Sequence, residues 1–430
     1  MPKLPSPVNE QIIQFIGGKI QVPDQPVIPY IEGDGVGPEI WRAARQVMEG
    51  AVELAYQGKR QILWKELLAG GKAFNLTGSW LPQETLLALK TYHIGMKGPL
   101  TTPIGEGIRS LNVSLRKELD LYTSLRPVKY MPGAPSPLRK PENVDIVLFR
   151  ENTEDVYAGI EFESGSVDAQ MLVTFLQERF PESYAQLRFP ASSAIGLKPI
   201  SREGSERIIR TAIEWALHNH RKSLTIIHKG NIMKYTEGAF MKWGYAMAEN
   251  DFAEQIYSMH QWKETAQKNG EAAANLELEY AKNAGKLIIR DMIVDAAFER
   301  AIIHPQDLDV LVTTNLNGDY LSDALAALVG GLGIAPGANI NFVTGDAIFE
   351  AAHGTAPAIA GKNIANPSSL ILSSVLMLRY LGWNEAANLV ENGLRKTLAS
   401  RHVTADFYDQ VKNSTLLSTS EFAEQIIQRM

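Results

Sequence analysis

The sequence predicts an α/β protein with a large, mostly parallel sheet, flanking helices and a second, smaller α/β domain. Short apolar runs rich in β-branched residues alternate along the chain with segments of helical periodicity. Several of these runs end in loops that contain glycine or asparagine, as strands do at the ligand-binding edge of a parallel sheet. The 430 residues, 45% of them hydrophobic, are enough for two domains with a large core.

The first elements form two units of strand, loop and helix. Residues 27–31 predict a strand and residues 40–52 a helix. The loop between them contains Gly33 and Gly35, but Pro38 stands where the dinucleotide-binding fingerprint needs its third glycine. We therefore do not expect a Rossmann fold. The second unit consists of a glycine turn at 70–74, a helix at 82–90, a strand at 93–99 and a loop at 101–107.

The alternation continues through the rest of the chain. Residues 164–199 are the hardest to interpret, and they suit an insertion with a helix at 169–179. The other expected elements are helices at 110–119, 205–219, 296–302 and 367–380, a helix that begins in the second half of 315–327, strands at 121–128, 144–149, 223–228, 286–290, 309–314 and 347–350, a loop at 336–341, and a helical C-terminal segment with a short loop at 402–406.

Charge and composition narrow the classes of partner. The formal net charge is -6 and no basic block is interleaved with aromatics, so we expect no nucleic acid and no membrane as partner. The chain has no cysteine and can form neither disulfides nor zinc–thiolate sites. Residues 1–7 contain no signal core, and no apolar run approaches the roughly 18 residues of a membrane helix. A cytoplasmic protein is expected.

Two aspartates after a buried strand suggest a cation site. Asp319 and Asp323 are four residues apart, so both carboxylates project from one helix face if Asp319 lies at or near the helix start. A single carboxylate there is typical of a helix cap. A pair at the end of a strand suits a hard divalent cation better.

Three arginines and two candidate proton carriers also occur at or after the ends of predicted strands and helices. Arg116, Arg126 and Arg150 occur at helix or strand ends. Two interpretations are open: they are exposed surface arginines, or they form a pocket for a polyanion such as a tricarboxylate. Tyr157 and Lys229 each follow a strand end and a polar loop, where a reacting group can face a cleft. A half-buried core tyrosine and a surface lysine are the alternatives for these two residues.

Seven segments together resemble the bacterial homodimeric isocitrate dehydrogenases, within the isocitrate/isopropylmalate dehydrogenase family. They are residues 33–39, 109–112, 125–127, 149–159, 228–234, 315–323 and 353–357. The resemblance covers essentially the whole chain and implies the fold of that family. It implies a large, cofactor-binding domain from 1–121 and 330–430, a small domain from 122–154 and 202–329 for metal, catalysis and dimer contact, and a clasp at 155–201.

The resemblance also implies an activity, the oxidative decarboxylation of isocitrate to 2-oxoglutarate and CO2 with a nicotinamide cofactor and Mg2+ or Mn2+, in the citric acid cycle. The implied substrate-binding residues are Thr101, Ser110, Asn112, Arg116, Arg126, Arg150 and Asn231. The implied metal ligands are Asp319 and Asp323 with Asp295 of the partner subunit. Tyr157 would protonate the enolate left by CO2, and Lys229 of the partner subunit would help remove the hydroxyl proton. The active sites of the homodimer would thus be shared.

Cofactor choice depends on a few positions. NADP-using bacterial members hold the 2′-phosphate with a Lys-Tyr pair, a further Tyr and an Arg, and this chain has Ala358, Ile359, Ala405 and Asp409 there. His304 appears where the partner subunit of those members supplies an arginine. These differences predict NAD rather than NADP. The expected cofactor contacts are His353, Gly354, Ala356, Ile359 and Asn366.

Several alternatives remain open at this point. The same reaction could use NADP, or the chain could be a sister 3-isopropylmalate or homoisocitrate dehydrogenase, although Ser110 and Asn112 are too polar for an isopropyl group. A catalytically silent regulatory subunit is a further alternative, and without the resemblance we would expect a metal-dependent phosphatase. Ser110 also matches a serine that is phosphorylated in some bacterial relatives, so a regulatory kinase and phosphatase are candidate partners.

Overall fold

A mixed sheet of eleven strands crosses the part of the chain that the computed structural model describes, residues 11–101 and 110–430. Residues 1–7, residues 102–107 of the expected loop, and Arg109 of the family motif lie outside these residues. In spatial order the strands are β11 (Ile256–Ser258), β12 (Leu287–Ile293), β10 (Ser223–His228), β13 (Val310–Thr313), β7 (Asp145–Glu151), β6 (Thr123–Lys129), β14 (Pro336–Ile340), β15 (Ala347–Ala351), β5 (Ile94–Lys97), β3 (Val27–Ile31) and β4 (Leu63–Glu66).

The sheet is mostly parallel, as the sequence predicts. Its only antiparallel pairs among the described residues lie at the centre, where β6 and β14 pair with each other and with β7 and β15. Strands β7 to β11 therefore form one parallel block, and strands β15 to β4 form a second block that runs the opposite way. The carboxyl ends of the two blocks lie at opposite edges, and the antiparallel central strands join the two blocks.

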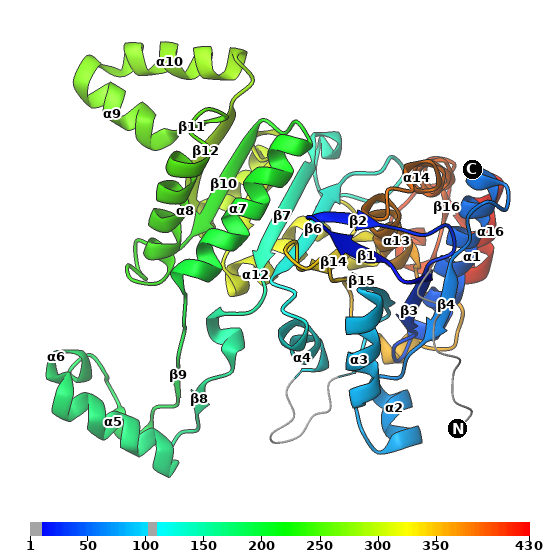
Figure 1. The fold of residues 1–430 in the computed structure, drawn as a ribbon, viewed down its shortest axis with the longest axis horizontal. Helices are drawn as coiled ribbons and strands as arrows, with labels where there is room; N and C mark the ends of the chain where they lie inside the picture. The colour runs from blue at the N-terminus through cyan, green and yellow to red at the C-terminus, as the bar shows by residue number, and fades with distance from the viewer. Residues whose placement is uncertain (1–10, 102–109) are drawn as a thin grey trace.

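Helices flank both blocks. They are α1 (Gly37–Tyr56), α2 (Gly70–Thr77), α3 (Gln83–Tyr92), α4 (Leu111–Glu118), α5 (Val167–Arg179), α6 (Pro181–Tyr184), α7 (Arg202–His218), α8 (Glu237–Asp251), α9 (Met259–Asn269), α10 (Glu271–Asn283), α11 (Val294–Ile303), α12 (Asn315–Ala327), α13 (Ser368–Tyr380), α14 (Asn384–Ala399), α15 (Ala405–Tyr408) and α16 (Thr419–Gln428). Of these helices, α5 and α6 lie apart from the sheet (Figure 1). Within the described ranges, no helix combines the length and the apolar character needed to cross a bilayer.

The main core joins the two ends of the chain. Helix α1 buries Ile40, Ala44, Val47 and Ala51 at the three- and four-residue spacing of one helix face. Near this face lie α13, α14 and α16, so the first helix and the last helices of the chain pack in one layer (Figure 1). A second apolar cluster packs α11 and α12 against the other block of strands.

An arm projects from the body between β7 and α7 (Figure 1). Its two strands, β8 (Glu161–Phe162) and β9 (Ile195–Gly196), pair antiparallel and lead out to α5 and α6. On α5, Val167, Met171 and Phe175 follow at four-residue spacing with exposures of 71%, 65% and 50%. These exposed apolar residues form one stripe, which we call the arm stripe. The arm lies within the segment expected to be a clasp, and the expected domain division stays a prediction.

Three sequence expectations about elements were wrong. Residues 70–74 do not form a turn but begin helix α2. Residues 336–341 are not a loop, because 336–340 form β14, whose residues are all buried. Pro336 is tolerated because it is the first residue of the strand, where a missing N–H costs little. Helix α12 starts at Asn315, so Asp319 lies in its second turn rather than at its start. The remaining short strands are β1 (Gln14–Ile16), β2 (Lys19–Gln21), β16 (His402–Val403) and β17 (Thr415–Leu416).

Candidate active site

One face of the central strands bears a row of buried polar side chains. Ser124 pairs with Arg150 across β6 and β7, and Arg126 lies two residues further along β6, so all three share a face. On the other side Asn339 of β14 pairs with Ser124, and Glu350 of β15 lies on the same face. Arg126, Arg150 and Glu350 are 8%, 2% and 3% exposed. Strands rather than loops therefore fix two of the arginines expected to bind substrate, Arg126 and Arg150.

These arginines concentrate positive charge in a dry environment. Burial, reinforced by Arg116 nearby, lowers the pKa of Arg150 to about 10, and burial also lowers the pKa of Arg126. Arg150 remains cationic at neutral pH. Arg116, on α4, donates to Glu350 Oε1 at 3.0 Å, and Lys97 lies 2.8 Å from Glu350 Oε2. Burial alone would raise the pKa of Glu350, but Lys97 and Arg116 hold it well below its usual range.

Helix α12 brings the expected metal ligands to this row. Asp319 accepts hydrogen bonds from Arg150 and from the Tyr157 hydroxyl, and the Arg150 guanidinium lies 5.0 Å from the Tyr157 ring centroid. Asn315 Oδ1 accepts from Arg150 Nε at 2.9 Å and from Nη2 at 2.8 Å. Burial raises the pKa of Asp323, and the neighbouring Asp319 raises it further. Two carboxylates in this relation suit a divalent cation, which would neutralise both.

Tyr157 is held as a neutral phenol. Burial, followed by the hydrogen bond to Asp319, raises the pKa of Tyr157 to about 12. A phenol with this pKa keeps its proton at neutral pH and can donate it. The side chain follows β7 in a short 3-10 helix, Asp155–Ala158, so the end of this strand positions it as the sequence predicts.

Helix α4 presents polar atoms that lack partners. Asn112 Oδ1 and Arg116 Nε are buried and have no hydrogen-bond partner among the described residues. Both atoms are therefore available to hydrogen-bond a ligand. Ser110 directly precedes α4. Thr101 is exposed, and its N–H donates to Asp34 Oδ2 at 2.8 Å.

Lys229 and Asp295 form a separate pair. Their side chains lie 2.6 Å apart at the carboxyl ends of the neighbouring strands β10 and β12, and 67% of the Asp295 side chain is exposed. Asn231 is also exposed. No group of three acids or histidines in the described part of the chain is placed to bind a metal, so Asp295 does not join Asp319 and Asp323 within one chain.

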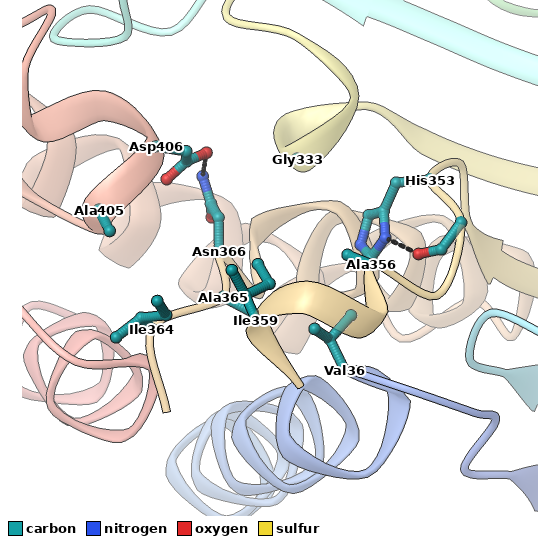
Figure 2. Close-up of a pocket in the computed structure, with 11 residues that line it drawn as sticks. Val36, Gly333, His353, Ala356, Ile359, Ile364, Ala365, Asn366, Ala405 and Asp406 are labelled. Carbon is teal, nitrogen blue, oxygen red and sulfur yellow. Dashed lines mark hydrogen bonds between the residues drawn. The ribbon is translucent and has the colours of Figure 1, made fainter. Parts of the chain in front are cut away.

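A cavity of about 650 Å³ lies beside the loop after β15. The five residues expected to contact the cofactor all line it (Figure 2). The lining residues are Val36, Gly333, His353, Gly354, Ala356, Ile359, Ile364, Ala365, Asn366, Ala405 and Asp406.

The chemistry of this cavity fits a nucleotide. Val36, Ile359 and Ile364 provide apolar wall for a base. Burial lowers the pKa of His353, whose Nδ1–H donates to the Gly354 carbonyl at 2.8 Å. Its Nε2 is buried and has no partner among the described residues, which leaves an acceptor for a ligand. Asn366 Nδ2 donates to Asp406 Oδ2 at 3.0 Å, so a carboxylate also borders the cavity (Figure 2).

Sequence reasoning missed three residues of these sites. Lys97 and Glu350 each lie near the end of a strand, where the rule that identified Arg150 also applies. Neither residue is followed directly by polar side chains, so the sequence pattern does not distinguish them. Asp406 had no signal, because it approaches the cavity from a segment distant in sequence.

Comparison with known proteins points to one family. Residues 27–426 match the family model described as isocitrate/isopropylmalate dehydrogenase. An isocitrate dehydrogenase [NADP] from Staphylococcus aureus is 54% identical over 98% of this chain and 99% of its own. The enzyme of that name from Streptococcus mutans is 49% identical over 96% and 98%. A crystal structure of isocitrate dehydrogenase from Methylococcus capsulatus matches with a TM-score of 0.72 at 37% identity, covering 94% of this chain and 98% of that one.

The names of these relatives contradict the expected preference for NAD, which was wrong. The expectation rested on Ala358, Ile359, Ala405 and Asp409, which lack the groups that hold a 2′-phosphate in some members. Ile359 and Ala405 do line the cavity. A missing contact at chosen positions does not decide the cofactor, however, because a phosphate can bind any suitably placed cation or N–H group.

The fold agrees with the expectation drawn from the motifs, and the matches extend over nearly the whole chain. This chain therefore belongs to the isocitrate/isopropylmalate dehydrogenase family.

Proposed function

We propose that this protein catalyses the oxidative decarboxylation of isocitrate to 2-oxoglutarate and CO2, with NADP as the electron acceptor. The observation that carries the proposal is the buried row of Arg116, Arg126 and Arg150 next to Asp319 and Tyr157. Relatives named as NADP-dependent isocitrate dehydrogenases support both the reaction and the cofactor.

The substrate fits the row by charge. Isocitrate has three carboxylates, and three guanidinium groups can each pair with a carboxylate through two hydrogen bonds. Asn112 and Arg116 offer the unpaired atoms described above, with Ser110, Thr101 and Asn231 as further binding residues. A 3-isopropylmalate substrate fits less well, because an isopropyl group needs an apolar wall where Ser110 and Asn112 lie.

The metal and the cofactor have sites of suitable chemistry. Asp319 and Asp323, with Asp295 of the partner subunit, would hold Mg2+ or Mn2+, which when bound polarises the forming carbonyl and stabilises the negative charge left by CO2. The cavity that contains His353, Asn366 and Ile359 would hold NADP, which accepts the hydride.

Two residues of the protein would move protons. Lys229 of the partner subunit takes the proton from the substrate hydroxyl as the hydride leaves the same carbon. The carbon–carbon bond to the β-carboxylate then breaks and CO2 departs. Tyr157 gives its proton to the carbon of the resulting enolate. The raised pKa of Tyr157 supports this role, because the phenol is protonated when it is needed.

We infer that the protein is a homodimer with shared active sites. Within one chain Lys229 pairs with Asp295 and not with Tyr157 or Asp319. The exposed arm stripe also needs an apolar partner, and a second copy of the arm would provide one.

Spectrophotometric assays test the proposal. We expect isocitrate to reduce NADP when Mg2+ or Mn2+ is present, and we expect EDTA to abolish the reaction. Full activity in EDTA would refute the metal assignment. Turnover of 3-isopropylmalate in place of isocitrate, or a strong preference for NAD, would refute the substrate or the cofactor.

A further inference from the structure

Glu237 is a fully buried carboxylate outside the residues assigned to catalysis. It is the first residue of α8 and is 0% exposed. Its Oε2 accepts from the Lys229 backbone N–H at 3.0 Å and from Asn317 Nδ2 at 2.7 Å. Its Oε1 accepts from the Thr314 hydroxyl at 2.8 Å. One side chain therefore holds both the loop that presents Lys229 and the start of α12.

Glu237 shares a counter-ion with a second buried acid. Lys198 Nζ lies 2.9 Å from Glu237 Oε1 and 2.5 Å from Asp155 Oδ1. Asp155 is also 0% exposed, and its Oδ2 accepts from the Leu316 N–H at 3.0 Å. Two carboxylates thus accept hydrogen bonds from the start of α12.

The same residues form the base of the arm. Asp155 lies where the chain leaves the body and Lys198 lies where it returns. The Asp155 N–H donates to the Pro199 carbonyl at 3.0 Å, which closes the base. The ammonium group that pairs with Glu237 therefore lies at the base of the arm.

We propose that Glu237 is a positioning residue that sets Lys229 and the first turn of α12 together, and so couples the two active sites of the dimer. The inference rests on the proposed function, in which Lys229 serves the partner's site and α12 presents Asp319 and Asp323 to its own site. Buried, fully hydrogen-bonded networks hold such groups rigidly.

The variant Glu237→Gln tests the proposal without leaving an unpaired charge. Two carboxylates share one ammonium in the wild type, so the variant leaves Asp155 and Lys198 as a balanced pair. In either orientation the amide NH2 faces a group that can only donate, the Lys198 ammonium or the Lys229 N–H. We expect kcat to fall about 10–100-fold. NADP binding, measured by fluorescence titration in the remote cavity, should not change.

Asp309→Asn is the matched control. Asp309 lies at the opposite end of β13, pairs with Arg221 and accepts from the backbone N–H groups of Lys222 and Ser223 at 2.7 and 3.0 Å. Its loss should lower Tm and leave kcat unchanged. An unchanged kcat in Glu237→Gln would overturn the proposal.

Hybrid dimers distinguish coupling from a local effect. A wild-type/Asp319→Asn hybrid should retain about half the wild-type activity, since one site is intact. A wild-type/Glu237→Gln hybrid should fall well below half, because the variant subunit disturbs α12 in one site and Lys229 in the other. Half activity in the second hybrid would overturn the coupling.

Lys198 provides an independent test if Glu237→Gln fails to dimerise. Lys198→Met should lower kcat, and Lys198→Arg, which keeps the charge, should restore much of it. Equal effects of the two substitutions would contradict the proposal. Wild-type protein that does not oxidise isocitrate would refute the proposed function alone, since the variants then have no reaction to report.

Discussion

At the scale of single residues, Arg150 shows why geometry matters beyond charge. Its guanidinium bonds Asn315 through Nε and Nη2, pairs with Asp319 and stacks on Tyr157. Lysine keeps the charge but not the planar fork. We therefore expect Arg150→Lys to lower kcat/KM for isocitrate about 100-fold, from the loss of two charge-assisted hydrogen bonds. Steady-state kinetics measure this, with Arg45→Lys at an exposed ion pair as the control.

His93 provides a pH-dependent contribution to stability. Its Nδ1 lies 2.7 Å from Asp346 Oδ1, and this hydrogen bond raises the pKa of His93 above its usual 6.5. A raised folded-state pKa means that the contribution is complete below pH 6.5 and is lost as pH rises through the folded value. His93→Gln should cost about 0.5–1 kcal/mol at mildly acid pH, because both groups are partly exposed. Thermal unfolding should show a smaller loss at alkaline pH.

The site residues that can be predicted from the sequence are those whose side-chain type and whose position at the end of an element both suit a binding site. Arg116, Arg126, Arg150, Asp319 and Tyr157 meet because strand ends and helix spacing bring them together. Glu237 was not predicted, because a buried acidic residue has no local sequence pattern that distinguishes it from an exposed one. The prediction of NAD failed for another reason, because cofactor choice depends on how several loops together surround the cofactor's 2′ position.

At the scale of elements, two helical glycines give opposite expectations. A Cβ on Gly318 of α12 would lie 2.3 Å from Thr313 Oγ1 and 2.6 Å from Arg150 Cγ. A Cβ on Gly50 of α1 would make ordinary contacts at 3.6 Å with Ile427. Alanine normally stabilises a helix by roughly 0.5–1 kcal/mol relative to glycine.

We therefore expect Gly50→Ala to raise the free energy of unfolding by about that amount. Gly318→Ala should lower both stability and kcat, because Arg150 must shift. Denaturant unfolding and kinetics on the two variants measure these effects. A stabilised, fully active Gly318→Ala would contradict the close packing.

Elements with regular periodicity were predictable, and β14 was not. Helix α1 follows one apolar stripe, and β10 is a plain β-branched run. Strand β14 contains Pro336, Gly337 and Asn339, and Asn341 follows it. These residue types locally favour a loop. Its pairing with β6 and β15 overrides that preference, and this pairing is visible only in three dimensions.

At the scale of the whole molecule, the arm stripe should control assembly and activity together. We expect Met171→Glu/Phe175→Glu to yield monomers, since charge on the stripe opposes apolar association. The monomer should be folded but inactive, because Lys229 and Asp295 of the partner subunit are missing. Analytical ultracentrifugation and the isocitrate assay measure the two effects. Gln177→Glu, at an exposed position off the stripe, is the control, and an active monomer would contradict site sharing.

The order of strands at the centre of the sheet also has a kinetic consequence. Leu125 of β6 pairs with Ala338 of β14, and β14 pairs in turn with β15. Contacts between such distant parts of the chain form slowly, because closing the long loop costs entropy before the strand pairing can stabilise it. The row of buried polar side chains that includes Arg126 and Glu350 cannot form until residues 336–351 have left the ribosome. A nascent chain therefore lacks this row of side chains until residue 351 has been synthesised.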